Sequence, residues 1–260
     1  MEFRDKVVFV AGGTSGINFG IAQAFAARGA RVAVLSRSEE KVEAAVKSLK
    51  AGGGCAVGFA GDVRDIGSIE AAMARVSAEW GAIDVLISGA AGNFLAEAEK
   101  LSANGFKTVI DIDLLGCFNV MRAAFPHLRK PGAAIVNITA PQSWLPTPMQ
   151  MHVCAAKAGI DQITRTAAME WGAHGIRVNS IAPGPIAETE GMRRLAPTPA
   201  AEKAWTDSIP LRRWGTKREI AKAAQWLCSD DAAYVTGVVL PVDGGWSLGG
   251  SGAMARAVVA

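Results

Sequence analysis

The chain has 260 residues, half of them hydrophobic, and a formal net charge of +3 at pH 7. This length fits one α/β domain, and the apolar content excludes a disordered chain. A basic excess this small and this dispersed argues against nucleic acid as a partner, but it fits an anionic small molecule.

Short apolar runs rich in β-branched residues alternate along the chain with longer amphipathic stretches. The apolar runs predict strands at Lys6–Ala11, Arg31–Ser36, Cys55–Ala60, Ile83–Ser88, Ala133–Thr139, Ile176–Ile181 and Val238–Pro241. The amphipathic stretches predict helices at Ile17–Arg28, Glu39–Lys50, Ile66–Trp80, Ala103–Arg129, Met151–His174 and Lys217–Ser229. Near-continuous apolar strands between helices are typical of parallel sheets. We therefore expect an α/β fold, a single doubly wound (Rossmann) domain over residues 1–260 with about seven parallel strands and helices on both faces.

Two segments break this alternation. Pro141–Gln150 is rich in proline, and Pro183–Pro210 contains five prolines. A long insertion of this kind in an α/β domain usually covers a ligand, so we expect a substrate lid within residues 183–210. The Gly- and Ala-rich tail, 247–260, is expected to be loose.

The first predicted strand runs into a glycine-rich turn, Ala11-Gly12-Gly13-Thr14-Ser15-Gly16-Ile17, and a helix follows. Glycine permits a tight turn and close approach to a pyrophosphate, while the helix N-terminus supplies unpaired N–H groups. A simple packing turn is the alternative. The strand and helix on either side favour a nucleotide site.

The end of the second predicted strand, Leu35-Ser36-Arg37, bears on which nucleotide binds. An acidic residue there would bind the adenosine ribose hydroxyls of NAD, whereas a hydroxyl and a guanidinium suit a 2′-phosphate. We therefore expect NADPH, with an ordinary surface arginine as the alternative for Arg37. Asp62 and Val63, after the third strand, are expected beside the adenine.

The cysteines and the chain ends bear on metal binding and location. Cys55, Cys117, Cys154 and Cys228 are widely spaced and form no Cys-x-x-Cys pair, so neither zinc nor a disulfide framework is indicated and no metal is expected. The polar N-terminus lacks the features of a signal peptide, and no apolar run reaches the ~20 residues that span a bilayer. We expect a cytoplasmic protein without a membrane partner.

Further motifs resemble those of the short-chain dehydrogenase/reductase family over nearly the whole chain. They are Ser88-Gly89-Ala90-Ala91-Gly92, Lys157, Arg177-Val178-Asn179, Pro183-Gly184-Pro185-Ile186 and Asp243-Gly244-Gly245. Asn18 departs from the family, which usually has a third glycine there. Together with the turn, the resemblance implies a cofactor site formed by Gly12, Thr14, Ser15, Gly16, Ile17, Ser36, Arg37, Asp62, Val63, Ala90, Gly92, Lys157, Pro183, Gly184 and Ile186.

Ketone reductases of this family use a Ser, a Tyr, a Lys and an Asn, and only the Lys is present here. The corresponding positions hold Ala140, Val153, Lys157 and Asp113. Val153 cannot donate a proton, so a general acid normally worth ~10²–10⁴-fold is missing.

Within the family, the segments 90–94, 106–113 and 182–186 resemble the 2,4-dienoyl-CoA reductases of the peroxisomal type. That resemblance implies a reaction that needs no tyrosine acid. Hydride adds to the far carbon of a conjugated diene, and negative charge moves to the thioester oxygen as a dienolate. A hydrogen-bond donor fixed in advance stabilises that oxygen.

The same resemblance implies roles for the candidate catalytic residues. Asn93 is the expected oxyanion donor, and Gln142 is a further donor. Asp113 and Lys157 are expected to hold the water that protonates the dienolate, and Lys157 also to bind the nicotinamide ribose. The alternatives are that Asn93 caps a helix and that Asp113 is only a structural partner of Lys157.

Apolar and basic residues in or beside the two proline-rich segments are candidates for contact with the substrate. They are Trp144, Met149, His152, Met192 and Arg193, and the resembling segment 90–94 adds Phe94. We therefore expect an NADPH-dependent reductase that converts a 2,4-dienoyl-CoA to an enoyl-CoA in fatty-acid breakdown, and by resemblance a homotetramer. The alternatives are another enoyl-thioester or conjugated-carbonyl reductase, and an NADP(H)-binding sensor or scaffold without catalysis.

Overall fold

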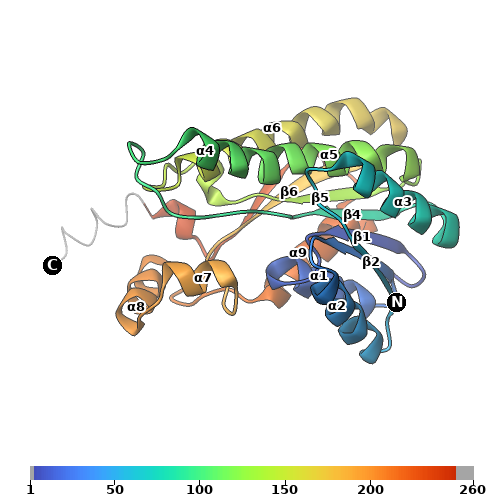
Figure 1. Cartoon of the computed structure of the whole chain (residues 1–260). Helices are drawn as coiled ribbons and strands as arrows, with labels where there is room; N and C mark the ends of the chain where they lie inside the picture. Colours follow the sequence, from blue (N-terminus) through green and yellow to red (C-terminus); the bar gives the residue numbers. More distant parts are fainter. Residues whose placement is uncertain (1–2, 250–260) are drawn as a thin grey trace.

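The computed structural model describes residues 3–249, which contain a seven-stranded sheet (Figure 1). The strands are β1 (Val7–Ala11), β2 (Arg31–Ser36), β3 (Cys55–Ala60), β4 (Val85–Ser88), β5 (Ala134–Ile138), β6 (Arg177–Pro183) and β7 (Val239–Val242). All neighbouring strands pair in parallel, in the order β3-β2-β1-β4-β5-β6-β7. Because β1 lies between β2 and β4, the winding reverses at the β1–β4 pair, the place where such sheets bind ligands.

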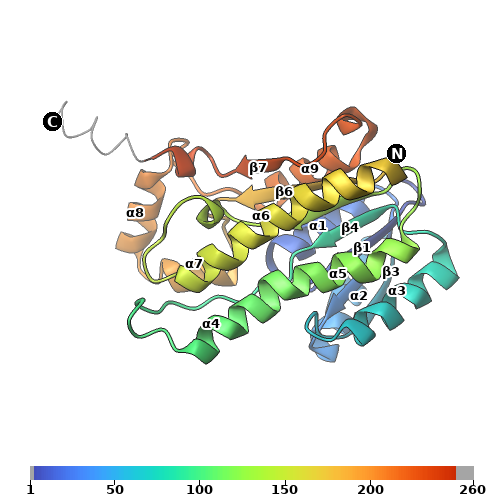
Figure 2. The same ribbon diagram turned by 90° about the horizontal axis from the view of Figure 1, so that it is seen from above.

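Helices cover both faces of the sheet, as the sequence predicts (Figures 1 and 2). They are α1 (Gly16–Ala26), α2 (Glu39–Ala51), α3 (Ile66–Trp80), α4 (Ala103–Val109), α5 (Gly116–Ala124), α6 (Met151–Trp171), α7 (Glu190–Leu195), α8 (Pro199–Ser208) and α9 (Lys217–Cys228). Helices α3, α5 and α6 bury one core against the sheet, and α1, α2 and α9 bury the other. The doubly wound fold is therefore confirmed.

Local signals explain where several helices begin. The Ser38 hydroxyl accepts a hydrogen bond from the Lys41 N–H at the start of α2, and the Asp65 carboxylate caps α3 in the same way. Helix α9 begins with a capping box in which Thr216 and Glu219 bond each other's backbone N–H groups. Bonds from Arg213 and Thr216 hold the pKa of Glu219 at about 2, so this cap is charged at neutral pH.

The structure differs from the sequence prediction over residues 103–129. One long helix was expected there, but α4 passes into a π-helical segment, η1 (Ile110–Leu115), before α5 and the 3-10 turn η2 (Phe125–His127). The apolar pattern continues across the segment, so periodicity alone does not separate a π turn from an α turn. π-helical turns are frequent at functional sites, and η1 carries Asp113.

The proline-rich segment after β6 contains two helices that the sequence analysis missed. Thr189 caps α7 and Thr198 caps α8, each through its side-chain oxygen. Prolines indicated irregular structure there, but Pro199 occupies the first position of α8, where a missing N–H costs nothing. Both helices lie beside the carboxyl ends of the strands (Figure 1).

The remaining short turns are 3-10 segments, namely η3 (Pro141–Ser143), η4 (Gly172–His174), η5 (Asp230–Ala232) and η6 (Trp246–Leu248). Most of the tail expected to be loose, 247–260, lies outside the described residues. Between residues 3 and 249, no helix has both the length and the apolar character needed to cross a membrane.

Candidate functional site

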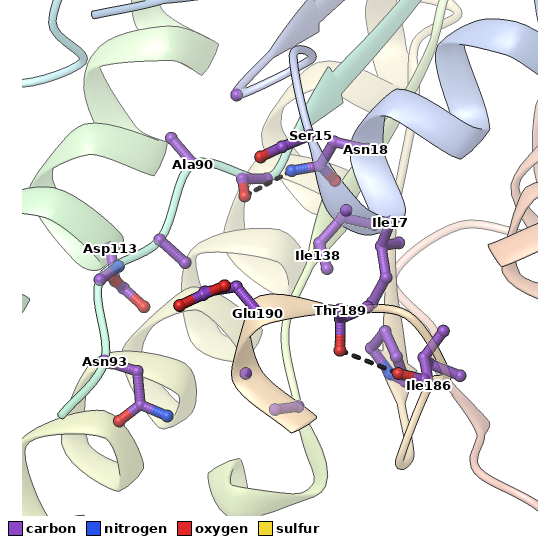
Figure 3. A pocket seen from close by; sticks show the side chains of 18 of the residues that line it. Ser15, Ile17, Asn18, Ala90, Asn93, Asp113, Ile138, Ile186, Thr189 and Glu190 are labelled. Carbon is purple, nitrogen blue, oxygen red and sulfur yellow. Dashed lines mark hydrogen bonds between the residues drawn. The ribbon is translucent and has the colours of Figure 1, made fainter. Parts of the chain in front are cut away.

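A cavity of about 500 Å³ opens at the carboxyl ends of the strands (Figure 3). It is lined by the segments that follow β1, β2, β3, β4, β5 and β6, and by residues of η1, α6 and α7. All fifteen residues predicted to hold the cofactor line it, together with Asn93, Asp113 and Gln142. The fold thus gathers the predicted nucleotide and catalytic residues, which are far apart in the sequence, around one space.

The glycine turn leaves room for a phosphate at one end of this cavity. Gly12 has φ +76°, and a Cβ there would lie 2.9 Å from the backbone N and Cα of Ala90, so only glycine fits. Gly16 has φ +58°, and a Cβ there would meet nothing within 4 Å. Ser15, the N-cap of α1, makes no side-chain capping bond, which leaves the first N–H groups of the helix free for a ligand. These features fit a nucleotide pyrophosphate.

Asn18, where the family usually has glycine, has a structural role. Its side chain is buried, and its Nδ2 donates to the Gly89 carbonyl oxygen at 2.6 Å (Figure 3). The bond joins the turn after β1 to the segment after β4, the two strands at which the winding reverses. The departure from the family pattern therefore adds a hydrogen bond between these two segments that glycine could not make.

Basic groups surround the end of the cavity formed by β2 and β3. Both Asp62 oxygens accept hydrogen bonds from the Arg64 guanidinium, at 2.6–3.1 Å, and these bonds lower the pKa of Asp62. Arg37 is exposed and makes no ion pair with any residue in the described range 3–249. Lys41, which the sequence analysis did not select, also lines this end. The positive charge available there exceeds the negative charge.

A buried ion pair occupies the middle of the site. Lys157 Nζ lies 3.1 Å from Asp113 Oδ2, and the two side chains are 8% and 1% exposed. Lys157 Nζ also donates to the Ile138 carbonyl oxygen at 3.3 Å. Asp113 Oδ1 accepts the Gly92 N–H at 2.7 Å. Asp113 thus connects the lysine on α6 to the segment that carries Asn93.

No tyrosine reaches this cavity. Val153, one turn before Lys157, lines it but packs against Val109 and Ala156, and Ala140 also lines it. The single tyrosine of the chain, Tyr234, is fully exposed and does not line the cavity. The cavity therefore lacks the phenol and the hydroxyl that a ketone reductase of the resembling family places at the positions of Val153 and Ala140.

Three side-chain amides meet at the far side of the site from the glycine turn. Gln142 Nε2 donates to Gln150 Oε1 at 3.0 Å, and Gln150 Nε2 donates to Asn93 Oδ1 at 3.5 Å. Asn93 lies beside Asp113 on one side of the cavity, opposite Ile186 and Thr189 (Figure 3). Sequence reasoning missed Gln150, since a glutamine before a predicted helix gives no signal of a role at a site.

The predicted substrate residues fall into several groups. Met192 lines the main cavity with Leu195 and Trp205, two further apolar residues of the segment 183–210. Trp144 and Met149 line a neighbouring cavity of about 680 Å³, which adjoins the first at Gln142.

The other predicted substrate residues do not line either cavity. Phe94 stacks on His152 with ring centroids 4.3 Å apart. His152 is fully buried, and burial lowers its pKa, which favours a neutral imidazole. Arg193 is exposed and pairs with Glu190.

Comparison with known proteins identifies relatives along most of the chain. Residues 11–247 match the family described as Enoyl-(Acyl carrier protein) reductase. The peroxisomal 2,4-dienoyl-CoA reductase [(3E)-enoyl-CoA-producing] of Rattus norvegicus is 48% identical over 93% of this chain and 84% of its own. A probable 2,4-dienoyl-CoA reductase [(2E)-enoyl-CoA-producing] of Bacillus subtilis is 40% identical over 92% and 96%. A crystal structure of a short chain dehydrogenase from Bacillus anthracis superposes with TM-score 0.82 at 40% identity, covering 93% of this chain and 96% of that one.

Asp161, one turn after Lys157 on α6, is a buried acid that the sequence analysis did not select. Its side chain is 4% exposed. Burial raises the pKa of its carboxyl group, and the nearby hydroxyls of Ser143 and Thr139 oppose that rise only in part. The folded protein therefore binds the Asp161 proton more tightly than the unfolded chain does.

From that difference we predict a pH-dependent effect of Asp161→Asn. The pKa of Asp161 is ~3.9 in the unfolded chain and higher in the folded protein, so the wild-type protein loses stability as pH rises through this interval. The asparagine of the variant carries no titrating proton, so the variant does not lose stability in this way. The variant should be more stable than the wild type at pH 8, and the difference should vanish toward pH 4. Urea unfolding at both pH values tests this, with the exposed Asp231→Asn as control. A variant that is less stable than the wild type at pH 8 would show that Asp161 is ionised and stabilising.

Proposed function

The chain belongs to the short-chain dehydrogenase/reductase family, and we propose that it is an NADPH-dependent 2,4-dienoyl-CoA reductase. The observation that carries the proposal is the replacement of the family's tyrosine acid by buried Val153, beside an amide donor, Asn93, at the same cavity. Relatives named as 2,4-dienoyl-CoA reductases, at 40–48% identity over most of the chain, support it.

The cavity suits a nicotinamide nucleotide, the cofactor that the family implies. The free N–H groups at the start of α1 would bind the pyrophosphate, and Lys157 would bind the nicotinamide ribose. We assign the 2′-phosphate of NADPH to Arg37 and Ser36, with Lys41 nearby as a second cation. A guanidinium without an ion-pair partner in the described part of the chain favours the phosphorylated nucleotide.

The site residues fit a reduction that passes through an anion on oxygen. When bound, the cofactor supplies a hydride to the far carbon of the diene. As charge develops on the thioester oxygen, Asn93 Nδ2 would donate a hydrogen bond to it, with Gln142 as a further donor. A water held at Asp113 and Lys157, whose ion pair borders the cavity, would then protonate the anion on carbon, and a proton from bulk solvent would neutralise the hydroxide that remains.

The apolar walls on either side of Gln142 suit an acyl chain. Met192, Leu195 and Trp205 cover one side of the main cavity, and Trp144 and Met149 line the neighbouring one. We propose that the acyl chain extends past Gln142 along these side chains and that residues 183–210, with α7 and α8, form the lid over it. Among the basic residues of α7, Arg193 is the candidate for the phosphates of coenzyme A.

Exposed apolar side chains on α5 and α6 bear on assembly. Phe118 on α5 and Met169 on α6 are large apolar side chains exposed to solvent, which is consistent with burial in the homotetramer that we propose. The cytoplasmic location stays a prediction, because several relatives carry the word peroxisomal in their names.

Replacing Arg37 tests the choice of cofactor. Arg37→Ala should weaken NADPH binding by ~1.5–3 kcal/mol, the value of a charge-assisted hydrogen bond, and should leave NADH binding nearly unchanged. Fluorescence titration with both nucleotides measures the difference. Arg122→Ala, which removes the same charge from α5 away from the cavity, is the matched control. Equal affinity of the wild-type protein for NADPH and NADH would contradict the assignment.

Replacing Asn93 tests the proposed reaction. A donor that meets the oxygen more strongly after hydride transfer lowers the barrier more than it improves binding. Asn93→Ala should therefore reduce kcat by ~10²–10³, and Asn93→Asp should reduce it further because a carboxylate repels the developing charge. NADPH affinity should be kept in both variants.

The measurement is single-turnover reduction of a dienoyl-CoA by protein with NADPH already bound. Asn104→Ala, which removes an exposed amide from α4, is the control and should react at the wild-type rate. If Asn93→Ala also reacts at that rate and loses only thermal stability, Asn93 is a structural residue and the proposed oxyanion site is wrong.

A further inference from the structure

We infer that Gln150 is a positioning residue that sets which end of the Asn93 amide faces the substrate. The inference rests on the proposed function, in which Asn93 donates a hydrogen bond to the thioester oxygen. It goes beyond that function because Gln150, which is buried and does not line the cavity, would determine the orientation of the Asn93 amide.

Gln150 is buried, and both polar atoms of its side chain bond other side-chain amides. It is the N-cap residue of α6, yet it makes no side-chain capping bond to that helix. Its side chain, 2% exposed, instead bonds the two other amides, accepting from Gln142 and donating to Asn93. A buried amide that gives up a helix cap to bond two side chains at a cavity points to a role at that cavity.

The direction of the hydrogen bonds determines how Asn93 is oriented. An amide has one accepting and one donating end. Gln150 turns Oε1 toward the donating Gln142 Nε2, so its Nε2 faces Asn93 and bonds the carbonyl oxygen Oδ1. Asn93 Nδ2 is therefore left free to donate, and within residues 3–249 no protein acceptor takes it. Reversal of Gln150 would reverse Asn93 and turn Oδ1 toward the cavity.

Two further contacts hold the segment around Asn93 against the residues beside Gln150. The Met149 carbonyl oxygen accepts the Ala96 N–H at 3.0 Å, and Met149 has φ +64°, a region that a non-glycine residue adopts only at a cost. The Phe94 ring stacks on His152. These contacts fix where Asn93 lies, so the longer bond from Gln150, at 3.5 Å, has only to select the orientation of an amide already in place.

The consequence is electrostatic. With Nδ2 toward the substrate, Asn93 donates a hydrogen bond to the developing oxyanion. With Oδ1 toward the substrate, the partial negative charge of the amide oxygen would instead repel the oxyanion. Loss of one oxyanion donor typically slows a reaction ~10²–10³-fold, and a reversed amide adds repulsion to that loss. Substrate binding before hydride transfer depends little on this contact, because the thioester oxygen then carries little charge.

Two substitutions at Gln150 separate orientation from packing. Gln150→Met keeps the volume and removes both hydrogen bonds, so Asn93 can adopt either orientation. Gln150→Glu keeps the acceptor for Gln142, but an ionised carboxylate only accepts, so at a pH above the pKa of this buried acid Asn93 must turn Nδ2 toward it and Oδ1 toward the cavity. The structure therefore predicts that Gln150→Glu is slower than Gln150→Met, although it retains more of the native bonds. A purely structural role predicts the reverse order.

The experiment is single-turnover reduction of hexadienoyl-CoA by each variant with NADPH bound. We expect Gln150→Glu to react ~10²-fold or more slowly than the wild type, with a smaller loss for Gln150→Met and unchanged affinity for NADPH and substrate. Gln162→Glu, which places the same charge on the exposed side of α6, should react at the wild-type rate. A wild-type rate for Gln150→Glu, or a greater loss for Gln150→Met, would overturn the inference.

A double variant shows whether Gln150 acts through Asn93. The double variant Asn93→Ala/Gln150→Glu should react no more slowly than Asn93→Ala alone, since the group that Gln150 orients is then missing. Additive losses would show that Gln150 acts elsewhere and would reject the inference, while the slow rate of Asn93→Ala would still support the proposed function. A wild-type rate for Asn93→Ala would reject both.

Discussion

The geometry of the site depends on the buried ion pair between Asp113 and Lys157. Two charges removed from water persist only when each is paired and hydrogen-bonded, and here the remaining bonds go to the Gly92 N–H and the Ile138 carbonyl. The pair therefore joins η1, α6, the segment after β4 and the end of β5. It fixes both the ammonium group that we assign to the nicotinamide ribose and the backbone next to Asn93.

Near that pair, apolar side chains occupy the positions where ketone reductases of the family have serine and the tyrosine acid. Side-chain amides lie where we expect the oxyanion to form. Val153 and Ala140 offer no proton to a carbonyl, so the site is poorly suited to ketones. Asn93, Gln142 and Gln150 form a connected set of dipoles that need not move when charge appears on a substrate oxygen. A conjugated thioester develops its charge on oxygen and takes its proton on carbon, which matches a site with donors but no tyrosine.

The sequence predicted the elements with local signals and missed those set by tertiary contacts. Strand ends fall within two residues of their predicted positions, and the sequence predicted the tight turn after β1 because Gly12 and Gly16 there both adopt positive φ. The π turn at Asp113 and the helices α7 and α8 were not predicted, since an apolar period or a set of prolines is compatible with more than one backbone path. Gln150 was missed for another reason. Its partner Asn93 lies 57 residues away, and only the fold brings the two together.

The most direct test of the account is the fate of the hydride. Protein with NADPH deuterated at the transferred position should be given hexadienoyl-CoA and acetoacetyl-CoA side by side, and the products analysed by NMR. The account predicts rapid reduction of the diene alone, with deuterium on the δ-carbon and a solvent hydrogen on the α- or γ-carbon. Comparable reduction of acetoacetyl-CoA, with deuterium on the carbonyl carbon, would contradict it and would show that another group supplies the missing proton.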